Sequence, residues 1–472
     1  MQQNRPGHLL QPAHNRLDVA VRCLAIEEYL GGRPGGLELY VRMQRIRTGA
    51  ADASAYVRNF TALIDSCLQQ GFRDDSEIEL DAHLQLMDGS HRLALALCLG
   101  ADSLPVMIRP CCVKAAGYGL AWFAGAGFTP AQLQRIAERH RELEAQCLEG
   151  ISCILWPPAQ PFFDDITAML RLLCEVRQVQ ERECRGDTLA RLVRAVYACD
   201  DIEEWKVARK LQGMTGRPPR LRSMRLYLPV PAFRLKAQAH TTISSCGEQL
   251  KALIRTAYKA RIPDYFHDII VHTGDNYTQS RYLAALLEPG FSLRDYFAAI
   301  AGFGYMIIRH DAPYASPRFP AVFPFGKDLD VICASGEIRD LADATAAYLR
   351  RSCRAPLQVR AVAAETGWHI RVEAPARAGP QLVYQFDLSA APAGLTAEFV
   401  AAALARRTPC GGFFAARLED ELIFRAQALA AAPAKQHHAA FIRAHSDDWQ
   451  PHAVREALAA PLWQAMPPDL RQ

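Results

Sequence analysis

The sequence predicts a multidomain protein of the α/β (α+β) class, and three observations support that class. The chain has 472 residues, enough for about three domains. Half of the residues are apolar and 22% are charged, which is typical of an ordinary globular protein. Segments with the apolar spacing of amphipathic helices alternate with short apolar runs that are typical of strands. This mixture predicts sheets covered by helices.

Four segments are expected along the chain. Residues 1–115 and 291–472 each contain a full succession of helices and strands, and each is expected to form an α/β domain. Residues 116–235 are expected to form a mainly helical connector that carries a basic stretch. Residues 236–290 are expected to form a small α/β segment between this connector and the last domain.

The composition of the chain bears on nucleic-acid binding, membrane insertion and secretion. The net charge of +4 is too small by itself to indicate nucleic-acid binding. No run approaches the roughly 18 consecutive apolar residues of a transmembrane helix, so no membrane span is expected. The N-terminus leads into no apolar signal core, and the 14 cysteines form no Cys-x-x-Cys pair. We therefore expect reduced, buried thiols and a cytoplasmic protein.

The first segment begins with helices. Two helices are predicted within residues 17–47, separated by the glycine-rich stretch at 31–36. A third is predicted over 55–70, where apolar residues recur at helical spacing and Gly71 closes the helix.

The sharpest motif of this segment is the turn at 88–92. It lies between a strand predicted over 84–87 and a helix that ends before Gly100, and a strand over 104–108 follows. Strand, glycine turn and helix in this order direct backbone N–H groups and the positive end of the helix dipole to one point, which favours an anion. The turn consists of Asp88, Gly89, Ser90, His91 and Arg92.

The side chains of this turn suit a phosphate. Ser90 adds a hydroxyl, and His91 and Arg92 add cationic or proton-shuttling groups beside it. The alternative is a helix N-cap turn, in which Asp88 and Ser90 satisfy backbone donors and the other side chains are solvated.

The stretch Asp88-Gly-Ser-His-Arg-Leu-Ala-Leu-Ala, with the Leu-Pro-Val strand after it, resembles the phosphate-binding motif of the ParB/sulfiredoxin-like fold. The resemblance covers roughly residues 17–112 and implies that Gly89, Ser90, His91 and Arg92 bind nucleotide phosphates. Sulfiredoxins have a cysteine where Ser90 stands, and partition proteins usually have a glutamate there. The form is closest to the kinase-like members, in which Asp88 would bind Mg²⁺ or act as a base.

The middle of the chain contains a dense basic stretch. Helices are predicted over 129–148 and 164–179, with a strand over 151–155 between them. Between Lys206 and Lys236 no acidic residue interrupts nine lysines and arginines. This stretch predicts either a surface that meets phosphates or an ordinary solvated surface.

A second polar turn follows a strand predicted from Asp268 to His272. The strand delivers His272, Asp275 and Asn276 into a loop, which is where α/β ligand sites lie. These residues predict metal ligands or an acid–base pair, and the alternative is a simple turn.

The last segment contains paired carboxylates. Asp328 and Asp330 stand two residues apart at the start of an apolar strand, just after Gly326 and Lys327. Residues i and i+2 of a strand face the same side, so both carboxylates are expected to project together. Converging hard oxygens on a rigid element favour a divalent metal. The alternative is a turn with two solvated aspartates.

The pattern Gly-x-Asp-x-Asp at the start of a strand resembles the nucleotidyltransferase-fold superfamily, over roughly residues 292–445. The resemblance implies a third carboxylate from a neighbouring strand, for which Asp387, after the strand-like run 381–386, is the best candidate. The family usually has Gly-Ser before the carboxylates, where this chain has Gly326-Lys327, and Lys327 would contact a phosphate. Arg309 and Lys435 are further candidates for phosphate contacts.

The two resemblances together imply a Mg²⁺-dependent phosphoryl- or nucleotidyl-transferase that uses a nucleoside triphosphate such as ATP or CTP. Asp328, Asp330 and Asp387 would hold the metal, and Asp88 would join them in catalysis. The expected acceptor is a small molecule or a saccharide precursor. One alternative is a DNA-associated ParB-like nucleotide-binding regulator, which the basic stretch would suit. Another is a scaffold in which both sites have decayed.

Overall fold

The structure is a computed structural model of the full chain. It describes residues 2–4, 6–10, 15–72, 77–101, 103–113, 117–184, 186–200, 202–217, 219–229, 231–236, 241–265, 268–310, 316, 318–376 and 379–471. Helices and four sheets occur together, so the expectation of a mixed α/β (α+β) protein is confirmed. The chain divides into two compact units: residues 1–182 with 220–280, and residues 183–219 with 281–472.

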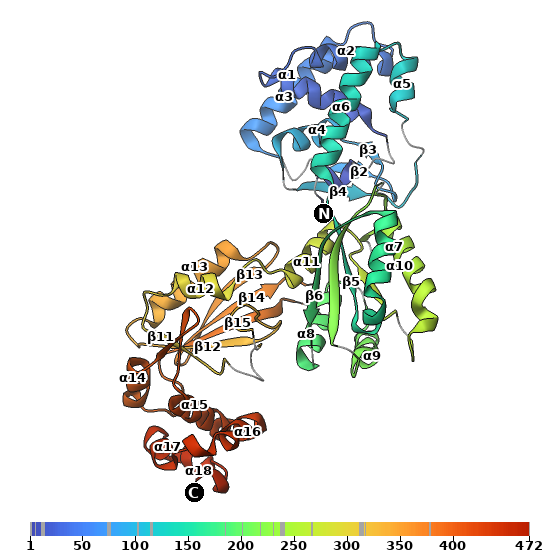
Figure 1. Ribbon diagram of the computed structural model, residues 1–472. Helices are drawn as coiled ribbons and strands as arrows, with labels where there is room; N and C mark the ends of the chain where they lie inside the picture. The colour runs from blue at the N-terminus through green and yellow to red at the C-terminus, as the bar shows by residue number, and fades with distance from the viewer. Residues whose placement is uncertain are drawn as a thin grey trace. The chain divides into compact units, whose positions relative to one another are not determined.

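The first unit begins with a small sheet and six helices (Figure 1). The strand order is β1-β4-β2-β3, with β2 and β4 parallel and the other pairs antiparallel. The strands are β1 (Gln2–Asn4), β2 (Ile78–Leu80), β3 (Leu86–Asp88) and β4 (Leu104–Ile108). The helices are α1 (Leu17–Tyr29), α2 (Gly36–Thr48), α3 (Ser54–Gln70), α4 (Ser90–Leu99), α5 (Leu120–Gly125) and α6 (Pro130–Cys147).

These elements confirm the helices predicted for the first segment, whereas the strand predicted over 84–87 forms over Leu86–Asp88. The glycine-rich stretch at 31–36 separates α1 from α2 as expected. Helix α6 begins where its sequence predicts, because Thr129 and Gln132 form a capping box that satisfies the free N–H groups of the first turn. One continuous apolar core extends from Leu9 in this segment to Val271 in the second sheet of the unit.

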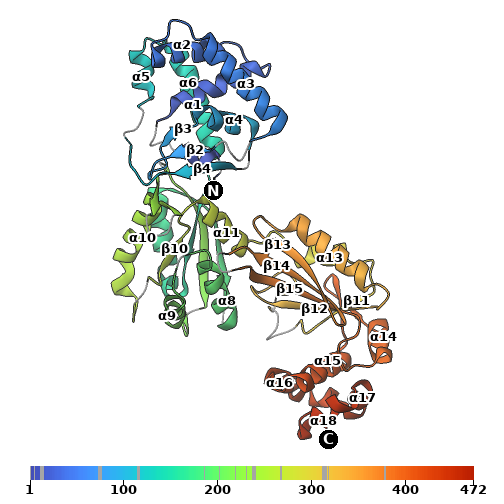
Figure 2. The same ribbon diagram turned by 180° about the vertical axis from the view of Figure 1, so that it is seen from behind.

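The second sheet of this unit has the strand order β10-β5-β7-β6. Its strands are β5 (Ile151–Leu155), β6 (Glu175–Glu183), β7 (Arg220–Tyr227) and β10 (Val271–Thr273). Helices α7 (Phe163–Leu173) and α10 (Ser245–Tyr258) lie beside it in Figure 1, and Figure 2 shows α10 there from behind. A hairpin of β8 (Phe233–Lys236) and β9 (Thr241–Ser244) completes the unit.

The predicted helix over 164–179 is wrong in its second half. Helix α7 ends at Leu173, and Cys174 has the extended dihedrals φ −156° and ψ 166°. From Glu175 the polar and apolar residues no longer recur at helical spacing, and pairing with β7 provides the backbone hydrogen bonds instead. Helices predominate in the middle of the chain as expected, but three strands of this sheet also come from it.

The second unit is built on a seven-stranded mixed sheet of order β13-β14-β15-β12-β11-β17-β16. The strands are β11 (Tyr305–Ile308), β12 (Asp328–Cys333), β13 (Gln358–Ala364), β14 (Gly367–Ala374), β15 (Gln381–Ser389), β16 (Thr408–Cys410) and β17 (Phe413–Ala415). β12 runs parallel to β15 and β11 parallel to β17, whereas the other pairs are antiparallel.

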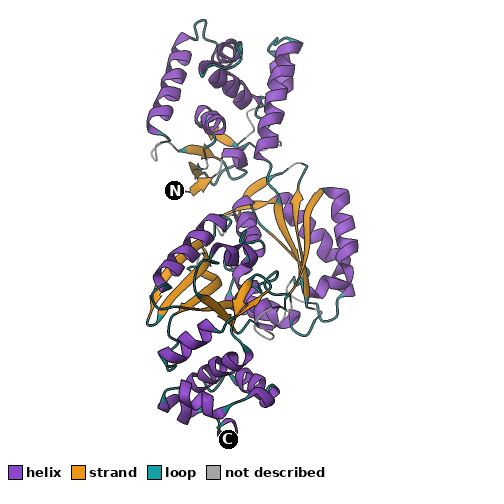
Figure 3. Cartoon of the chain, turned by 60° about the vertical axis from the view of Figure 1, so that its left-hand side comes forward, coloured by secondary structure: helices purple, strands orange, loops and turns teal. Residues whose placement is uncertain are grey.

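Helices surround this sheet. Helix α13 (Ile338–Ser352) packs on β13, β14 and β15. The unit also holds α8 (Gly186–Tyr197), α9 (Glu204–Met214) and α12 (Leu293–Ala299), with most of α11 (Tyr277–Leu287). The chain after β17 is helical (Figure 3). The helices after β17 are α15 (Leu418–Ala431), α16 (Gln436–Ala444), α17 (Pro451–Ala457) and α18 (Ala460–Ala465). Helix α14 (Ala397–Ala405) precedes β16.

The C-terminal helices share a core with the sheet. Met306 and Ile308 of β11 and Ile332 of β12 belong to the same apolar cluster as buried residues of α14, α15, α16 and α17. This packing holds the helical end of the chain against the strand that carries the paired aspartates. Among the described helices, none combines the length and the apolar character that crossing a bilayer requires.

Candidate metal centre

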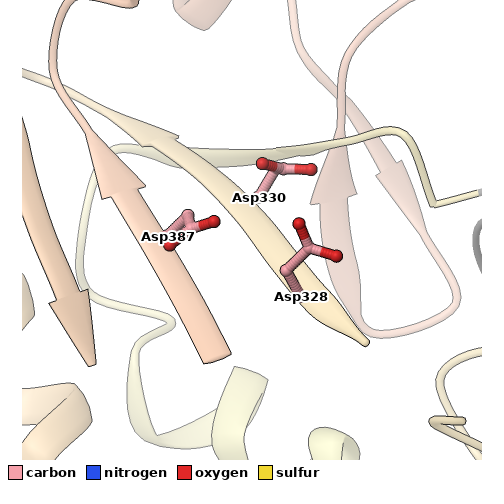
Figure 4. Close-up of side chains that lie close together, drawn as sticks. All are labelled: Asp328, Asp330 and Asp387. Carbon is pink, nitrogen blue, oxygen red and sulfur yellow. The ribbon is translucent and has the colours of Figure 1, made fainter. Parts of the chain in front are cut away.

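Three carboxylates converge on one face of the seven-stranded sheet, over two of its inner strands. Asp328 and Asp330 come from β12 and Asp387 from β15, and Figure 4 shows their carboxylates facing a common point. The parallel pairing of the two strands places Asp330 opposite Asp387 and Asp328 opposite Gln385. One oxygen from each of the three aspartates lies within 4.8 Å of the others. The sequence-predicted triad is therefore brought together by strand register.

The turn before Asp328 needs a glycine. Gly326 has a φ of +73°, which side chains other than glycine rarely adopt. A Cβ atom at this position would lie 2.6 Å from Cδ of Arg191, a residue of α8. The Arg191 guanidinium donates a hydrogen bond to the Gly326 carbonyl oxygen. The glycine thus allows the sharp turn and the close approach of an arginine that anchors it.

Asp387 is held by two neighbouring side chains. Nδ1 of His369 lies 2.5 Å from Oδ1 of Asp387, and Nε2 of Gln385 donates to the same oxygen at 2.8 Å. His369 stands directly opposite Asp387 on β14, and Gln385 precedes it by two residues on β15. All three side chains therefore project from the same face of the sheet.

Asp330 has an unusual electrostatic environment. Burial raises its pKa to about 7, the charges of Asp328, Asp387 and Glu421 add to the increase, and the charge of Arg309 opposes it. The Arg309 guanidinium donates to Oδ1 of Asp330 at 2.6 Å. Even with this arginine in place, Asp330 holds its proton more tightly than an isolated aspartate does, so its surroundings are short of positive charge.

The donor set fits a divalent metal such as Mg²⁺. Three carboxylates supply hard oxygen ligands from two hydrogen-bonded strands, and a raised pKa marks a cluster that a cation would stabilise. The residues that would hold the ion are Asp328, Asp330 and Asp387.

Arg309 is itself fixed in position. Its backbone has a φ of +55°, and its N–H donates to both carboxylate oxygens of Glu421 at 3.0 and 3.1 Å. Glu421 also accepts a hydrogen bond from Arg425, which is buried. Cζ of Arg425 lies 3.6 Å from the centroid of the Phe441 ring. Helix α15 thereby holds the arginine beside the carboxylates.

Cations of three segments lie around His437, at the start of α16. Desolvation and then the positive charges of Lys435, Arg425, Lys327 and Arg309 lower its pKa. Of these cations, Arg309 contacts the carboxylate of Asp330, and Lys327 immediately precedes Asp328. Arg309, Lys327 and Lys435 were all candidates for phosphate contacts from sequence, and those contacts stay a prediction.

The turn at 88–92 has a different character. Asp88 is exposed, and its Oδ1 accepts a hydrogen bond from the N–H of Gly89 at 2.7 Å. Gly89, with a φ of +98°, precedes the first residue of α4. Arg92 donates to the carbonyl oxygen of Glu77 and lies 3.7 Å from Asp88. These contacts secure the turn itself.

Ser90 and His91 face protein groups. Oγ of Ser90 accepts a hydrogen bond from Arg16 at 3.0 Å. Nε2 of His91 lies 2.9 Å from the hydroxyl of Tyr40, and its ring packs edge-on against Phe60. Desolvation and the charges of nearby arginines lower the pKa of His91 to about 3, so this ring is neutral at pH 7. The expected cation at His91 is therefore not present in this environment.

The basic stretch is divided between elements. It extends over α9, β7 and β8, and several of its members pair with acidic groups of the same chain. Arg222 is buried and pairs with Asp164 and Glu181, and Lys206 pairs with Glu203. Part of this charge is therefore engaged within the protein, as the alternative of an ordinary surface stretch requires.

The polar turn after β10 caps the first turn of helix α11. Oδ1 of Asn276 accepts a hydrogen bond from the N–H of Gln279, in the first turn of α11, and Nδ2 of Asn276 donates to the Thr242 carbonyl oxygen. Asp275 pairs with Lys251 at 3.4 Å. These contacts correspond to the alternative of a simple turn.

Sequence reasoning missed His369, Gln385 and Glu421. His369 lies on β14, and its alignment with Asp387 depends on the register between two strands. Comparisons of the chain with family models, with curated proteins and with solved structures give no match.

Proposed function

We propose that the second unit is a Mg²⁺-dependent phosphoryl- or nucleotidyl-transferase that uses a nucleoside triphosphate. The observation that carries this proposal is the convergence of Asp328, Asp330 and Asp387 within 4.8 Å, beside a set of cations. A carboxylate cluster alone suits a metal ion. A carboxylate cluster flanked by arginine and lysine suits a metal ion together with a polyphosphate.

The residues divide into two groups by charge. The three aspartates would hold Mg²⁺, which when bound neutralises charge on transferring phosphates. Lys327 and Lys435 would bind the phosphate oxygens that point away from the carboxylates. Arg309 pairs with Asp330 and is held by Glu421 through its backbone, so its guanidinium is already placed near the phosphates.

Asp387 has one oxygen left for a metal ion. Its Oδ1 is occupied by His369 and Gln385, and none of the described residues donates a hydrogen bond to its Oδ2. Oδ2 would bind Mg²⁺, beside which the acceptor hydroxyl would lie. We propose a small molecule or a saccharide precursor as this acceptor, because the net charge of +4 gives no support for a nucleic acid.

The first unit would contribute a second phosphate-binding corner at Gly89, Ser90 and Arg92. Ser90 is the first residue of α4, so N–H groups of the first helical turn lie beside its hydroxyl. Asp88 is exposed at this corner and is proposed as its acidic group.

Labelled nucleotides test the proposal. The full chain would be incubated with Mg²⁺ and ATP or CTP labelled at either the α- or the γ-phosphorus, and the products would be separated. Transfer of the α-label to an acceptor with release of pyrophosphate indicates nucleotidyl transfer, whereas transfer of the γ-label with release of the nucleoside diphosphate indicates phosphoryl transfer. The variants Asp328→Asn and Asp387→Asn should lose the reaction. Unchanged activity in both variants would exclude the triad from the chemistry.

A binding comparison separates the alternatives. A DNA-associated regulator would bind duplex DNA with an affinity that falls steeply as salt rises. The transferase would instead gain thermal stability from Mg²⁺ with one nucleoside triphosphate, by mass action. A decayed scaffold would show neither response.

A further inference from the structure

We propose that His369, Gln385 and Arg371 form a positioning relay that fixes the carboxylate of Asp387 for a divalent cation. This inference rests on the proposed function, because it assigns these residues a role at the same metal centre. None of these three residues is proposed as a metal ligand. Each acts on the ligand through hydrogen bonds.

Strand register builds the relay. β14 and β15 are antiparallel, with His369 opposite Asp387 and Arg371 opposite Gln385. Side chains directly opposite each other on antiparallel strands are close neighbours, and residues i and i+2 share a face. The three relay residues and Asp387 therefore form a two-by-two array on one face of the sheet.

The direction of each hydrogen bond follows from the chemistry of the groups. Arg371 has only donors, so its Nε, 3.1 Å from Oε1 of Gln385, must donate. This bond fixes the amide of Gln385 with its NH₂ group toward Asp387, at 2.8 Å from Oδ1. An ionised carboxylate only accepts, so Nδ1 of His369, at 2.5 Å, also donates to Oδ1.

Two donors on one oxygen orient the whole carboxylate. Oδ1 is occupied by His369 and Gln385, and no residue in the described part of the chain donates to Oδ2. Oδ2 is thus the oxygen left for a cation shared with Asp328 and Asp330. Outer hydrogen-bond partners of metal ligands typically contribute about 10- to 100-fold to metal affinity, because they hold the ligand in its binding orientation.

A purely structural role makes a different prediction. If His369 served only to pair β14 with β15, its loss would lower stability and leave the cation affinity of the folded protein unchanged. The two roles are separated by measuring affinity and stability on the same variants.

Titration with Mn²⁺, followed by the electron paramagnetic resonance signal of the free ion, provides the affinity. The full chain would be compared with His369→Ala, His369→Asn and Gln385→Ala. The amide nitrogen of Asn replaces Nδ1 as a donor, so His369→Asn serves as the conservative rescue variant. Gln358→Ala is the matched control, because Gln358 is an exposed polar residue on the neighbouring strand β13. Unfolding midpoints in EDTA show whether each variant is folded.

We expect His369→Ala and Gln385→Ala each to weaken Mn²⁺ binding by about 10- to 100-fold. His369→Asn and Gln358→Ala should bind with an affinity close to that of the unmodified chain. If the unmodified chain binds Mn²⁺ and His369→Ala and Gln385→Ala bind it equally well, the relay is wrong and the metal centre stands. If His369→Asn loses as much affinity as His369→Ala, the donor role is wrong. If the unmodified chain binds no Mn²⁺ at millimolar concentration, both the metal centre and the relay are wrong.

Discussion

Replacing Asp330 by asparagine is expected to stabilise the metal-free protein. Burial raises the pKa of Asp330 to about 7, against an ordinary value of 3.8, and the charges of Asp328 and Asp387 contribute to this increase. A pKa difference of about 3 corresponds to roughly 4 kcal/mol at pH 8, at which Asp330 is ionised in the folded and the unfolded chain. The side chain of Asp330 is 17% exposed, so we expect about half of this value, about 2 kcal/mol, after discounting for solvent screening.

The sign of the pH dependence is fixed by the direction of the shift. The folded state keeps the Asp330 proton at pH values where the unfolded state has released it. The stability that this proton provides is therefore complete below pH 3.8 and is lost as the pH rises through about 7. Asparagine cannot ionise, so Asp330→Asn does not undergo this loss. The advantage of the variant should be largest at pH 8 and smaller at pH 5.

Thermal unfolding in EDTA between pH 5 and pH 8 measures the effect. For a unit of roughly 200 residues, about 2 kcal/mol raises the melting temperature by about 5 °C. Asp343→Asn on α13 is the control, because Asp343 is exposed and lies outside the triad. Added Mg²⁺ should stabilise the unmodified protein and leave the Asp330 variant unchanged. A variant that melts at or below the unmodified protein at pH 8 in EDTA would refute the electrostatic reasoning.

Three further predictions concern other parts of the chain. Since the pKa of His91 is lowered to about 3, the unmodified protein should lose stability as the pH falls below 6.5. Urea unfolding from pH 7 to pH 4 should show a smaller loss in His91→Phe, and an unchanged dependence of stability on pH would contradict this prediction. Thr129→Ala should lower the free energy of unfolding by about 1 kcal/mol, because it removes the α6 capping box, whereas Thr129→Ser should retain it in the same assay. Gly326→Ala should destabilise the turn before Asp328 by about 1–3 kcal/mol and weaken Mn²⁺ binding, because residue 326 has a φ of +73° and a Cβ atom there would meet Arg191. Mn²⁺ binding as tight as in the unmodified protein would show that the turn adapts.

Local chemistry made several elements predictable. Helix α3 has apolar residues at helical spacing and forms over 54–70, against a predicted 55–70. The two aspartates of β12 lie on one face because the side-chain period of a strand is two. Asp387 was predictable only with the help of a family resemblance, since nothing in its own segment indicates which strand lies beside it.

The features that were not predictable depend on long-range register. His369 reaches Asp387 because β14 and β15 pair with one particular alignment, and a shift by one residue would turn His369 to the other face of the sheet. The neutral state of His91 likewise depends on burial and on the charges of Arg22 and Arg47, which come from two earlier helices. The end of α7 was mispredicted because pairing of β6 with β7 provides the backbone hydrogen bonds from Glu175 onward.

Crystals soaked in Mn²⁺ test the central claim most directly, because anomalous scattering locates this ion independently of the protein atoms. If the three aspartates form a metal site, one strong anomalous peak is expected between Asp328, Asp330 and Asp387, with an oxygen of each carboxylate within coordination distance. Millimolar Mn²⁺ that produces no peak among these three carboxylates, or a peak only elsewhere on the chain, would contradict it.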